Sequence, residues 1–266
     1  MPPVLDYQGI FAVFGPWLMA FGLILIRLTG LFLTTPILSA PFLSPQVKMG
    51  LVGTLTILVM STTDIPPALT QLNTMALAGA AIMELLIGAT MGFAIMLLFG
   101  ALNLTGQLLG IQMGFAIANV VDPSTGAQAG VLAQVLNLMC MLLFIAFDGH
   151  LLLIRALFDS FVTVPIGSAN PQTNVIISEL IDQSVTLFHI GLRIGLPVVC
   201  TVLLINVGLA TIARTVPQVN IFVIGFLITI GVGMLVLGMS IPTTAFVFQT
   251  YLEEALQRSV KMPSLF

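Results

Sequence analysis

Charged side chains are scarce in this sequence. Of its 266 residues, 7 are Lys or Arg and 10 are Asp or Glu, together 6% of the chain, whereas soluble domains carry about 25% charged residues. The basic residues are scattered, which excludes a basic patch that binds nucleic acid. The net charge of −3 is too small to steer charged ligands. With 58% hydrophobic residues, the sequence indicates an integral membrane protein or the buried core of an assembly.

Cysteine and histidine are almost as scarce. Cys140 and Cys200 lie inside apolar runs, where a thiol behaves as a small hydrophobic side chain, so neither a disulfide framework nor a CxxC metal site is present. His150 and His189 stand apart from any Cys or carboxylate at metal-ligand spacing. No Ser lies in a GxSxG setting, and an intramembrane enzyme needs a nucleophile beside a base. We therefore expect no metal, no cofactor and no enzymatic activity.

Long apolar runs fill most of the chain, and a helix crosses a bilayer with about 20 residues. The second run is short for a span, and the fourth is one kinked helix or a tight hairpin turned at Asp148. Pro242 is expected to break or kink the last run, and the amphipathic residues 246–261 to form a solvated helix. The fold class is thus all-α, with polytopic hydrophobic hairpins and kinked helices. The six candidate spans are residues 10–35, 47–63, 75–102, 131–164, 185–212 and 221–241.

Small residues recur every fourth position in the stretch 103–130, at Gly106, Gly110 and Gly114. Each Gly costs a helix about 1 kcal/mol relative to Ala, but this spacing forms a ridge that a second backbone can approach closely. Amide and carboxyl groups that are costly against lipid project from the same stretch, namely Gln107, Gln112, Asn119 and Asp122. A flexible polar loop is the simpler interpretation. Apolar neighbours such as Phe115 favour a half-buried segment that faces protein or an aqueous passage.

Ionisable side chains interrupt the apolar runs, and at membrane depth such groups face protein or water. Gly88 and Gly92 follow Glu84 at four-residue intervals, which places the acid and both glycines on one helix face. An isolated ionised carboxylate is very costly in a low dielectric, so we expect Glu84 to have a buried partner in this or another chain; the alternative is a protonated or snorkelling carboxyl. The residues expected to take part in buried charge pairing, within the chain or between subunits, are Arg27, Glu84, His189 and Arg193.

Short motifs follow one another in a specific order along most of the chain, although each alone is weak. They are Arg27-x-x-Gly30 before Pro36, Glu84-x-x-x-Gly88-x-x-x-Gly92, Gly106 to Gly114 with Asp122-Pro123, Asp148-Gly-His150, Ser160-Phe161 with Pro165, Leu196-Pro197, and Arg214-x-x-Pro217-Gln218-x-Asn220-x-Phe222. This pattern resembles the FliR family, the R subunits of the bacterial flagellar type III export gate, which are related to the T subunits of virulence type III secretion systems.

The resemblance implies one R copy in a helical hetero-oligomer with FliP and FliQ, in contact with FlhB and FlhA, in the inner membrane at the flagellar basal body. Residues 1–178 would be P-subunit-like hairpins that include a central plug loop at about 103–130. Residues 179–266 would be a Q-subunit-like hairpin with an amphipathic C-terminal tail. The implied plug residues are Gly106, Gln107, Gly110, Gln112, Gly114, Phe115, Asn119 and Asp122. The implied loop that faces the switch protein FlhB contains Arg214, Pro217, Gln218 and Asn220.

The leading functional hypothesis is therefore a non-enzymatic structural subunit of a gate through which unfolded flagellar proteins are exported. A virulence export-gate subunit is the nearest alternative. A secondary transporter is a third, because broken helices with intramembrane acids mark substrate sites in such proteins. The two halves of the sequence share no repeated motif, which argues against a transporter.

Overall fold

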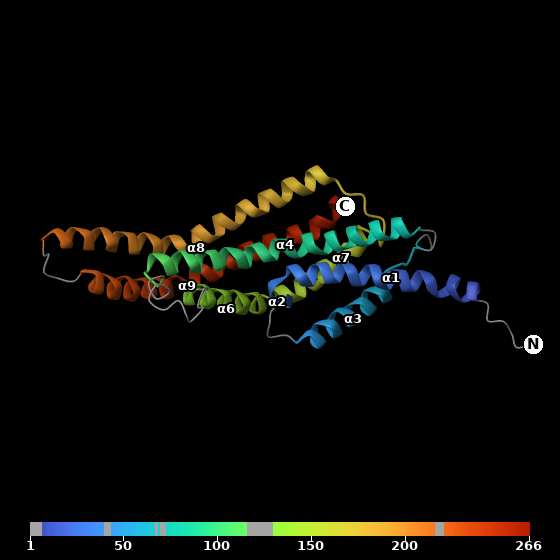
Figure 1. Ribbon diagram of the computed structural model, residues 1–266, viewed down its shortest axis with the longest axis horizontal. Coiled ribbons are helices and arrows are strands. Elements are labelled where there is room, and N and C mark those ends of the chain that lie inside the picture. Colours follow the sequence, from blue (N-terminus) through green and yellow to red (C-terminus); the bar gives the residue numbers. More distant parts are fainter. Residues whose placement is uncertain (1–6, 40–43, 67–68, 70–72, 116–129, 216–220) are drawn as a thin grey trace, which may run out of the picture. The chain divides into compact units, whose positions relative to one another are not determined.

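The computed structural model describes residues 7–39, 44–66, 69, 73–115, 130–215 and 221–266, and these contain helices and no strand (Figure 1). The all-α fold class is confirmed. The helices are α1 (Tyr7–Thr34), α2 (Pro36–Ser39), α3 (Pro45–Thr62), α4 (Thr74–Gln112), α6 (Val131–Ala146), α7 (Gly149–Thr163), α8 (Thr173–Thr215) and α9 (Ile221–Lys261), followed by the 3-10 helix η3 (Met262–Leu265).

Fewer helices qualify as membrane spans than the six runs suggest. Among the described residues, four segments are long and apolar enough, or five if α6 and α7 count as one broken span; the four are Phe14–Thr34, Thr74–Gln112, Thr173–Thr215 and Ile224–Leu265. Helix α3 is not among them. It has 18 residues, and Pro45, Gln46 and Lys48 in its first turn leave too short an apolar stretch to cross a bilayer.

The last helix corrects two further expectations. The expected break at Pro242 is wrong, because helix α9 continues through this residue, whereas a kink at Pro242 stays a prediction. Its final turns are packed rather than solvated: Phe248, Leu252 and Ser259 are buried, each with at most 1% of its surface exposed. The amphipathic pattern of residues 246–261 thus reflects a face that packs inside the protein.

The fourth run is broken at Asp148. Helix α6 is capped at Phe147, whose N–H donates to the carbonyls of Leu143 and Ile145. Asp148 then adopts a φ of +53°, in the left-handed region that Asp tolerates better than most residues other than Gly. Helix α7 begins immediately afterwards at Gly149. The sequence left a kinked helix and a hairpin open, and the structure shows two separate helices.

The chain divides into two compact units. The first comprises residues 1–96, 149–182 and 254–266, and the second comprises residues 97–148 and 183–253. Helices α4, α8 and α9 each contribute one segment to either unit. In the first unit α1 packs on α2 and α3, and α7 contacts η3. The core of the second unit consists of Leu109, Met113, Leu132, Leu136, Val198, Val202 and Leu237. The P-like and Q-like division at residue 178 rests on the resemblance and stays a prediction.

Candidate functional site

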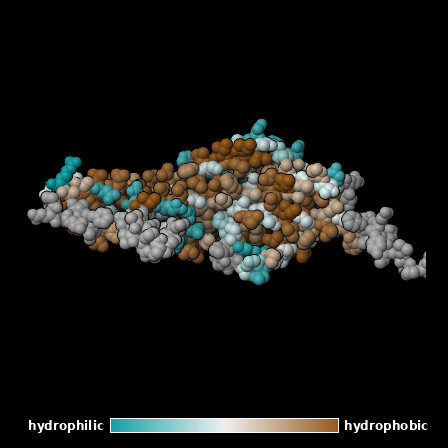
Figure 2. Space-filling view, in the orientation of Figure 1, coloured by the Kyte–Doolittle hydropathy of each residue, from teal (hydrophilic) through white to brown (hydrophobic). Residues whose placement is uncertain are grey.

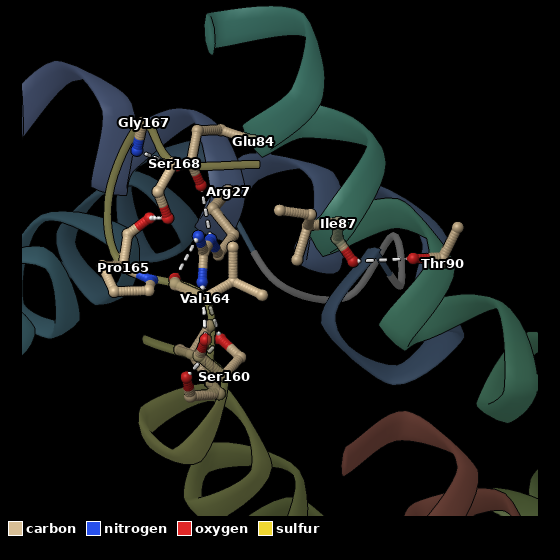
Figure 3. A network of polar contacts seen from close by, with 10 residues as sticks. Arg27, Glu84, Ile87, Thr90, Ser160, Val164, Pro165, Gly167 and Ser168 are labelled. Carbon is tan, nitrogen blue, oxygen red and sulfur yellow. Dashed lines mark hydrogen bonds and ion pairs between the residues drawn. The ribbon is translucent and has the colours of Figure 1, made fainter. Parts of the chain in front are cut away.

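Arg27 on α1 and Glu84 on α4 form a buried ion pair in the first unit (Figure 3). The Arg27 Nε donates to Glu84 Oε2 at 2.5 Å, and the two side chains are 0% and 1% exposed. The remaining guanidinium nitrogens also have partners. Nη1 donates to the carbonyl and the hydroxyl of Ser160, both at 3.1 Å, and Nη2 donates to the Val164 carbonyl at 3.1 Å. The cation is therefore neutralised and hydrogen-bonded on every side.

The end of α7 explains why Arg27 finds carbonyl acceptors there. The last carbonyls of a helix carry a partial negative charge, and that of Ser160 accepts from Arg27 in addition to the Val164 N–H at 2.9 Å. Pro165 follows Val164 and has no N–H with which to continue the helix. The Phe161 ring lies 4.0 Å from the Arg27 guanidinium carbon, which adds a cation–π contact. Arg27 thus fixes the end of α7 against α1.

Glu84 has a second partner in the connection between α7 and α8. Its Oε1 accepts a hydrogen bond from the Gly167 N–H at 3.0 Å. Gly167 has a φ of +73°, a conformation that glycine adopts without strain. Both carboxylate oxygens are therefore used. Removing one member of such a buried pair typically costs about 3–5 kcal/mol, because the other charge is left uncompensated.

Glycines bring the two charged helices close together. A Cβ on Gly30 of α1 would collide with the Leu85 carbonyl, and one on Gly88 of α4 would collide with the Arg27 carbonyl. Gly92, one turn beyond Gly88, faces α1 in the same way, and a Cβ there would lie 3.0 Å from the Leu31 carbonyl. The glycines therefore permit a close helix crossing. This crossing places Arg27 within reach of the carboxylate one turn from Gly88.

The structure brings Arg27 and Glu84 together and places the other two expected pairing residues elsewhere. His189 and Arg193 lie on α8 in the second unit, and both are exposed. Neither forms an ion pair with any part of the chain that the structure describes. The sequence left open whether His189 and Arg193 pair within the chain or with another subunit. Pairing with another subunit stays a prediction.

The first part of the expected plug loop is helical, because α4 extends to Gln112. Gly106 lies at a close helix contact, since a Cβ there would collide with the backbone of Ala133 on α6. Among the described residues nothing lies within 4 Å of a Cβ on Gly110, although Gly110 itself is buried. Gly114 follows the end of α4 with a φ of +87°. The glycine ridge therefore serves packing within the chain at Gly106, and at Gly110 the described residues make no comparable contact.

The polar plug residues are partly outside the described part of the chain. Gln107 is exposed on α4 and its amide nitrogen donates to Asn103 Oδ1 at 2.6 Å. Gln112 is also exposed, and Phe115 is half-buried. Asn119 and Asp122 lie outside the described residues.

The loop expected to face the switch protein is described only at its start. Arg214 lies in the last turn of α8 and is exposed, where a cation is favourable at the negative end of the helix dipole. Pro217, Gln218 and Asn220 lie outside the described residues.

Sequence reasoning missed a second charged cluster near the end of α9. Arg258 donates to Glu179 at 3.2 Å and to Glu254 at 2.7 Å, beside a pocket of about 530 Å³ in the first unit. The Ser259 hydroxyl is fully buried and donates to the Met91 carbonyl. The four-residue spacing of Glu254 and Arg258 was a detectable signal; the contacts with Glu179 and Met91 depend on tertiary packing. No group of His, Cys, Asp and Glu within the described ranges is suited to hold a metal.

The fold and the charge network define a class: a polytopic α-helical membrane protein whose N-terminal buried charges are neutralised within the chain. Residues 18–255 match the family described as bacterial export proteins, family 1. The chain belongs to this family. It is similar to the FliR type of flagellar biosynthetic protein.

Three relatives illustrate that similarity. The chain is 38% identical to the flagellar biosynthetic protein FliR of Pectobacterium carotovorum subsp. carotovorum over 85% of both chains. It is 34% identical to FliR of Escherichia coli K12 over 86% of this chain and 87% of the relative. It is 33% identical to FliR of Bacillus subtilis 168 over 84% of this chain and 86% of the relative. The resemblance to the FliR family inferred from the motif order is confirmed.

Proposed function

We propose that the chain is a non-enzymatic structural subunit of the flagellar type III protein export gate. One observation carries this proposal: the chain matches flagellar biosynthetic proteins from three organisms along at least 84% of its length. The buried ion pair supports a structural rather than a catalytic role for Arg27 and Glu84, because both side chains are buried and the nitrogens of Arg27 and both oxygens of Glu84 already have hydrogen-bond partners.

The exposed apolar surface supports assembly with other subunits. Large hydrophobic side chains are exposed along α8, among them Phe188, Leu203 and Leu204, which are 58%, 54% and 70% exposed. Figure 2 shows hydrophobic residues over much of the visible surface. Lipid accounts for apolar side chains but not for Arg193 on the same helix, because a cation against acyl chains is costly. A helix of this kind is suited to lie against other protein chains.

The expected partners are FliP and FliQ in a hetero-oligomer that contains one copy of this chain, with FlhB and FlhA adjacent and unfolded flagellar proteins as the cargo. The proposed location is the inner membrane at the flagellar basal body. In this arrangement residues 1–178 act as the P-like part and residues 179–266 as the Q-like part, and the segment from Gly106 to Asp122 closes the pore. These assignments follow from family membership, and the apolar, glycine-rich character of that segment supports them.

Native mass spectrometry tests the proposal. The chain is expressed with and without its P and Q neighbours and extracted in detergent. The expected result is a defined heteromer with one copy of this chain. In a separate assay, expression of the chain should restore swimming in a strain that lacks its own FliR. A monomer or homodimer that is indifferent to those neighbours, together with no restored motility, would contradict the proposal.

A further inference from the structure

A small apolar depression lies between α4 and α8 in the second unit. Gly191 and Gly195 line it, and Leu108, Leu192 and Leu196 are among the other lining residues. Its volume is about 30 Å³, and a single water needs roughly 10–15 Å³ by the same kind of measure. The depression is therefore large enough for the end of one aliphatic side chain.

The lining of the depression disfavours water as its occupant. Thr105 is the one polar side chain in the lining. Its hydroxyl already contacts two carbonyls, those of Ala101 at 2.8 Å and Gly191 at 2.9 Å. A buried water normally needs two to four polar partners, and this lining does not offer them. An apolar group fits the depression better.

The glycines account for the shape of the depression. A Cβ on Gly191 would lie 3.3 Å from the Ala101 carbonyl oxygen, and one on Gly195 would lie 3.2 Å from the Thr105 methyl group. The two glycines thus allow α8 to approach α4 closely. Leu192 and Leu196, four residues apart on α8, also line the depression and are 52% and 48% exposed.

Two basic side chains are neighbours of these leucines on the surface of α8. His189 precedes Leu192 by three positions and Arg193 precedes Leu196 by three, which makes them neighbours on the helix surface. Both are exposed. An acyl chain would fill the depression but would leave Arg193 facing hydrocarbon, at a high cost. The occupant that suits this surface brings an apolar side chain and a negative charge together.

We propose that this depression is a docking site for a helix of a different subunit. One large aliphatic side chain of that helix inserts between Leu192 and Leu196, in the manner of a knob in a hole. An Asp or Glu about one helical turn away pairs with Arg193, and the rim contacts exclude water from that pair. This inference rests on the proposed function, since it names the chemistry of the partner that contacts α8.

Site-specific photo-crosslinking tests the inference in membranes that contain the chain with its export-apparatus neighbours. A photoreactive phenylalanine analogue replaces Leu196 at the depression or, as a control, Leu204, which lies two turns further along α8 and is 70% exposed. Each is combined with Arg193, Arg193→Glu or Arg193→Lys. The crosslinked peptides are identified by mass spectrometry.

We expect an adduct from position 196 to a different chain, in a peptide that carries an Asp or Glu within one turn of the crosslinked residue. Arg193→Glu should reduce this adduct at least about tenfold, as loss of a desolvated charge pair does, while Arg193→Lys retains it and the adduct from position 204 persists. An adduct from 204 with none from 196 would overturn the docking site and leave the proposed function standing. An adduct from position 196 to lipid or to a second copy of the chain would also overturn the docking site. The same holds if Arg193→Glu leaves the yield of the adduct from position 196 unchanged. Protein adducts from neither position would count against both.

Discussion

Helices α4 and α8 are both long and apolar, yet they differ in how much of their apolar surface is buried within the chain. They have 39 and 43 residues. In the most apolar window of α4, 61% of the residues are buried within the chain, against 11% in α8. The one acid inside α4, Glu84, has an arginine, a backbone amide and glycine-lined contacts around it. The bases of α8, His189 and Arg193, are exposed.

Hydropathy alone therefore does not say what an apolar helix contacts. The ionisable groups are more informative, because their cost in a low dielectric demands a partner. In the first unit the chain supplies that partner itself. For His189 and Arg193 on α8 the described part of the chain supplies no ion-pair partner, which is the physical reason to look for one in another subunit.

The largest expected effect is the loss of one member of the buried pair. Glu84→Leu should destabilise the protein by about 3–5 kcal/mol, because Arg27 is left buried and uncompensated. Glu84→Gln should cost less and Glu84→Lys more. The measurement is equilibrium unfolding of the detergent-extracted protein, together with the yield of the assembled complex.

The double variant Arg27→Leu with Glu84→Leu should be more stable than Glu84→Leu alone, since no isolated charge remains. Glu253→Gln on α9 is the matched control, because Glu253 is exposed, and it should stay within about 0.5 kcal/mol of the parent. Equal stability and complex yield for all the Glu84 variants would show that the carboxylate is not in a buried pair.

The glycine crossing gives effects of opposite sign on one helix. Gly88→Ala should destabilise by about 1–3 kcal/mol, because the new Cβ meets the Arg27 carbonyl. Gly79→Ala, also in α4, has open space around the Cβ and should stabilise the helix by up to about 1 kcal/mol. Thermal unfolding of both variants measures the difference. If both substitutions shift stability in the same direction, the close crossing is not needed.

A third prediction separates the two glycines of the proposed plug. Gly106→Leu should destabilise the protein by about 1–3 kcal/mol through its contact with Ala133. Gly110→Leu should leave the chain's own stability nearly unchanged and instead impair gate closure, measured as ion leakage across the membrane, or reduce secretion. Full secretion with unchanged leakage in the Gly110→Leu strain would contradict a packing role for Gly110 in the gate.

The smallest effect is expected at the half-exposed cluster on α9. Arg258→Gln removes contacts with Glu179 and Glu254 whose side chains are 36% and 42% exposed, so the loss should be about 0.2–1 kcal/mol and should shrink in high salt. Arg155→Gln is the control, because Arg155 is exposed and has no ion-pair partner in the described ranges. A loss as large as that of Glu84→Leu would remove the contrast between buried and surface pairs.

The sequence predicted the helical class and marked Arg27 and Glu84 as charges that need buried partners. It did not identify them as each other's partner, because they are 57 positions apart and their meeting depends on how α1 and α4 cross. The contacts of Arg27 with the carbonyls of Ser160 and Val164 could not be predicted either, because every residue has a main-chain carbonyl and a side-chain pattern does not show which ones accept a hydrogen bond. The Glu84-x-x-x-Gly88 spacing did predict the shared face.

Other predictions were wrong because tertiary packing overrode the local sequence pattern. Pro242 reads locally as a helix end, yet α9 continues through it. Ser259 lies in a segment that reads as amphipathic and solvated, yet it is fully buried. The glycine spacing gave Gly106 and Gly110 equal weight, and only the position of α6 distinguishes them. Each of these outcomes depends on neighbours distant in sequence, which a periodicity does not contain.

The most direct test uses the two native cysteines. Cys200 on α8 is exposed and Cys140 on α6 is buried. Alkylation of Cys200 by a small uncharged maleimide therefore measures whether this face of α8 is covered, and Cys140 is the internal control. The extent of labelling at each thiol is measured by mass spectrometry, with the chain alone and with its P and Q neighbours. We predict that Cys200 is labelled in the chain alone and protected in the assembly, while Cys140 is unreactive in both. Equal labelling of Cys200 in both samples would show that no other subunit covers this face of α8.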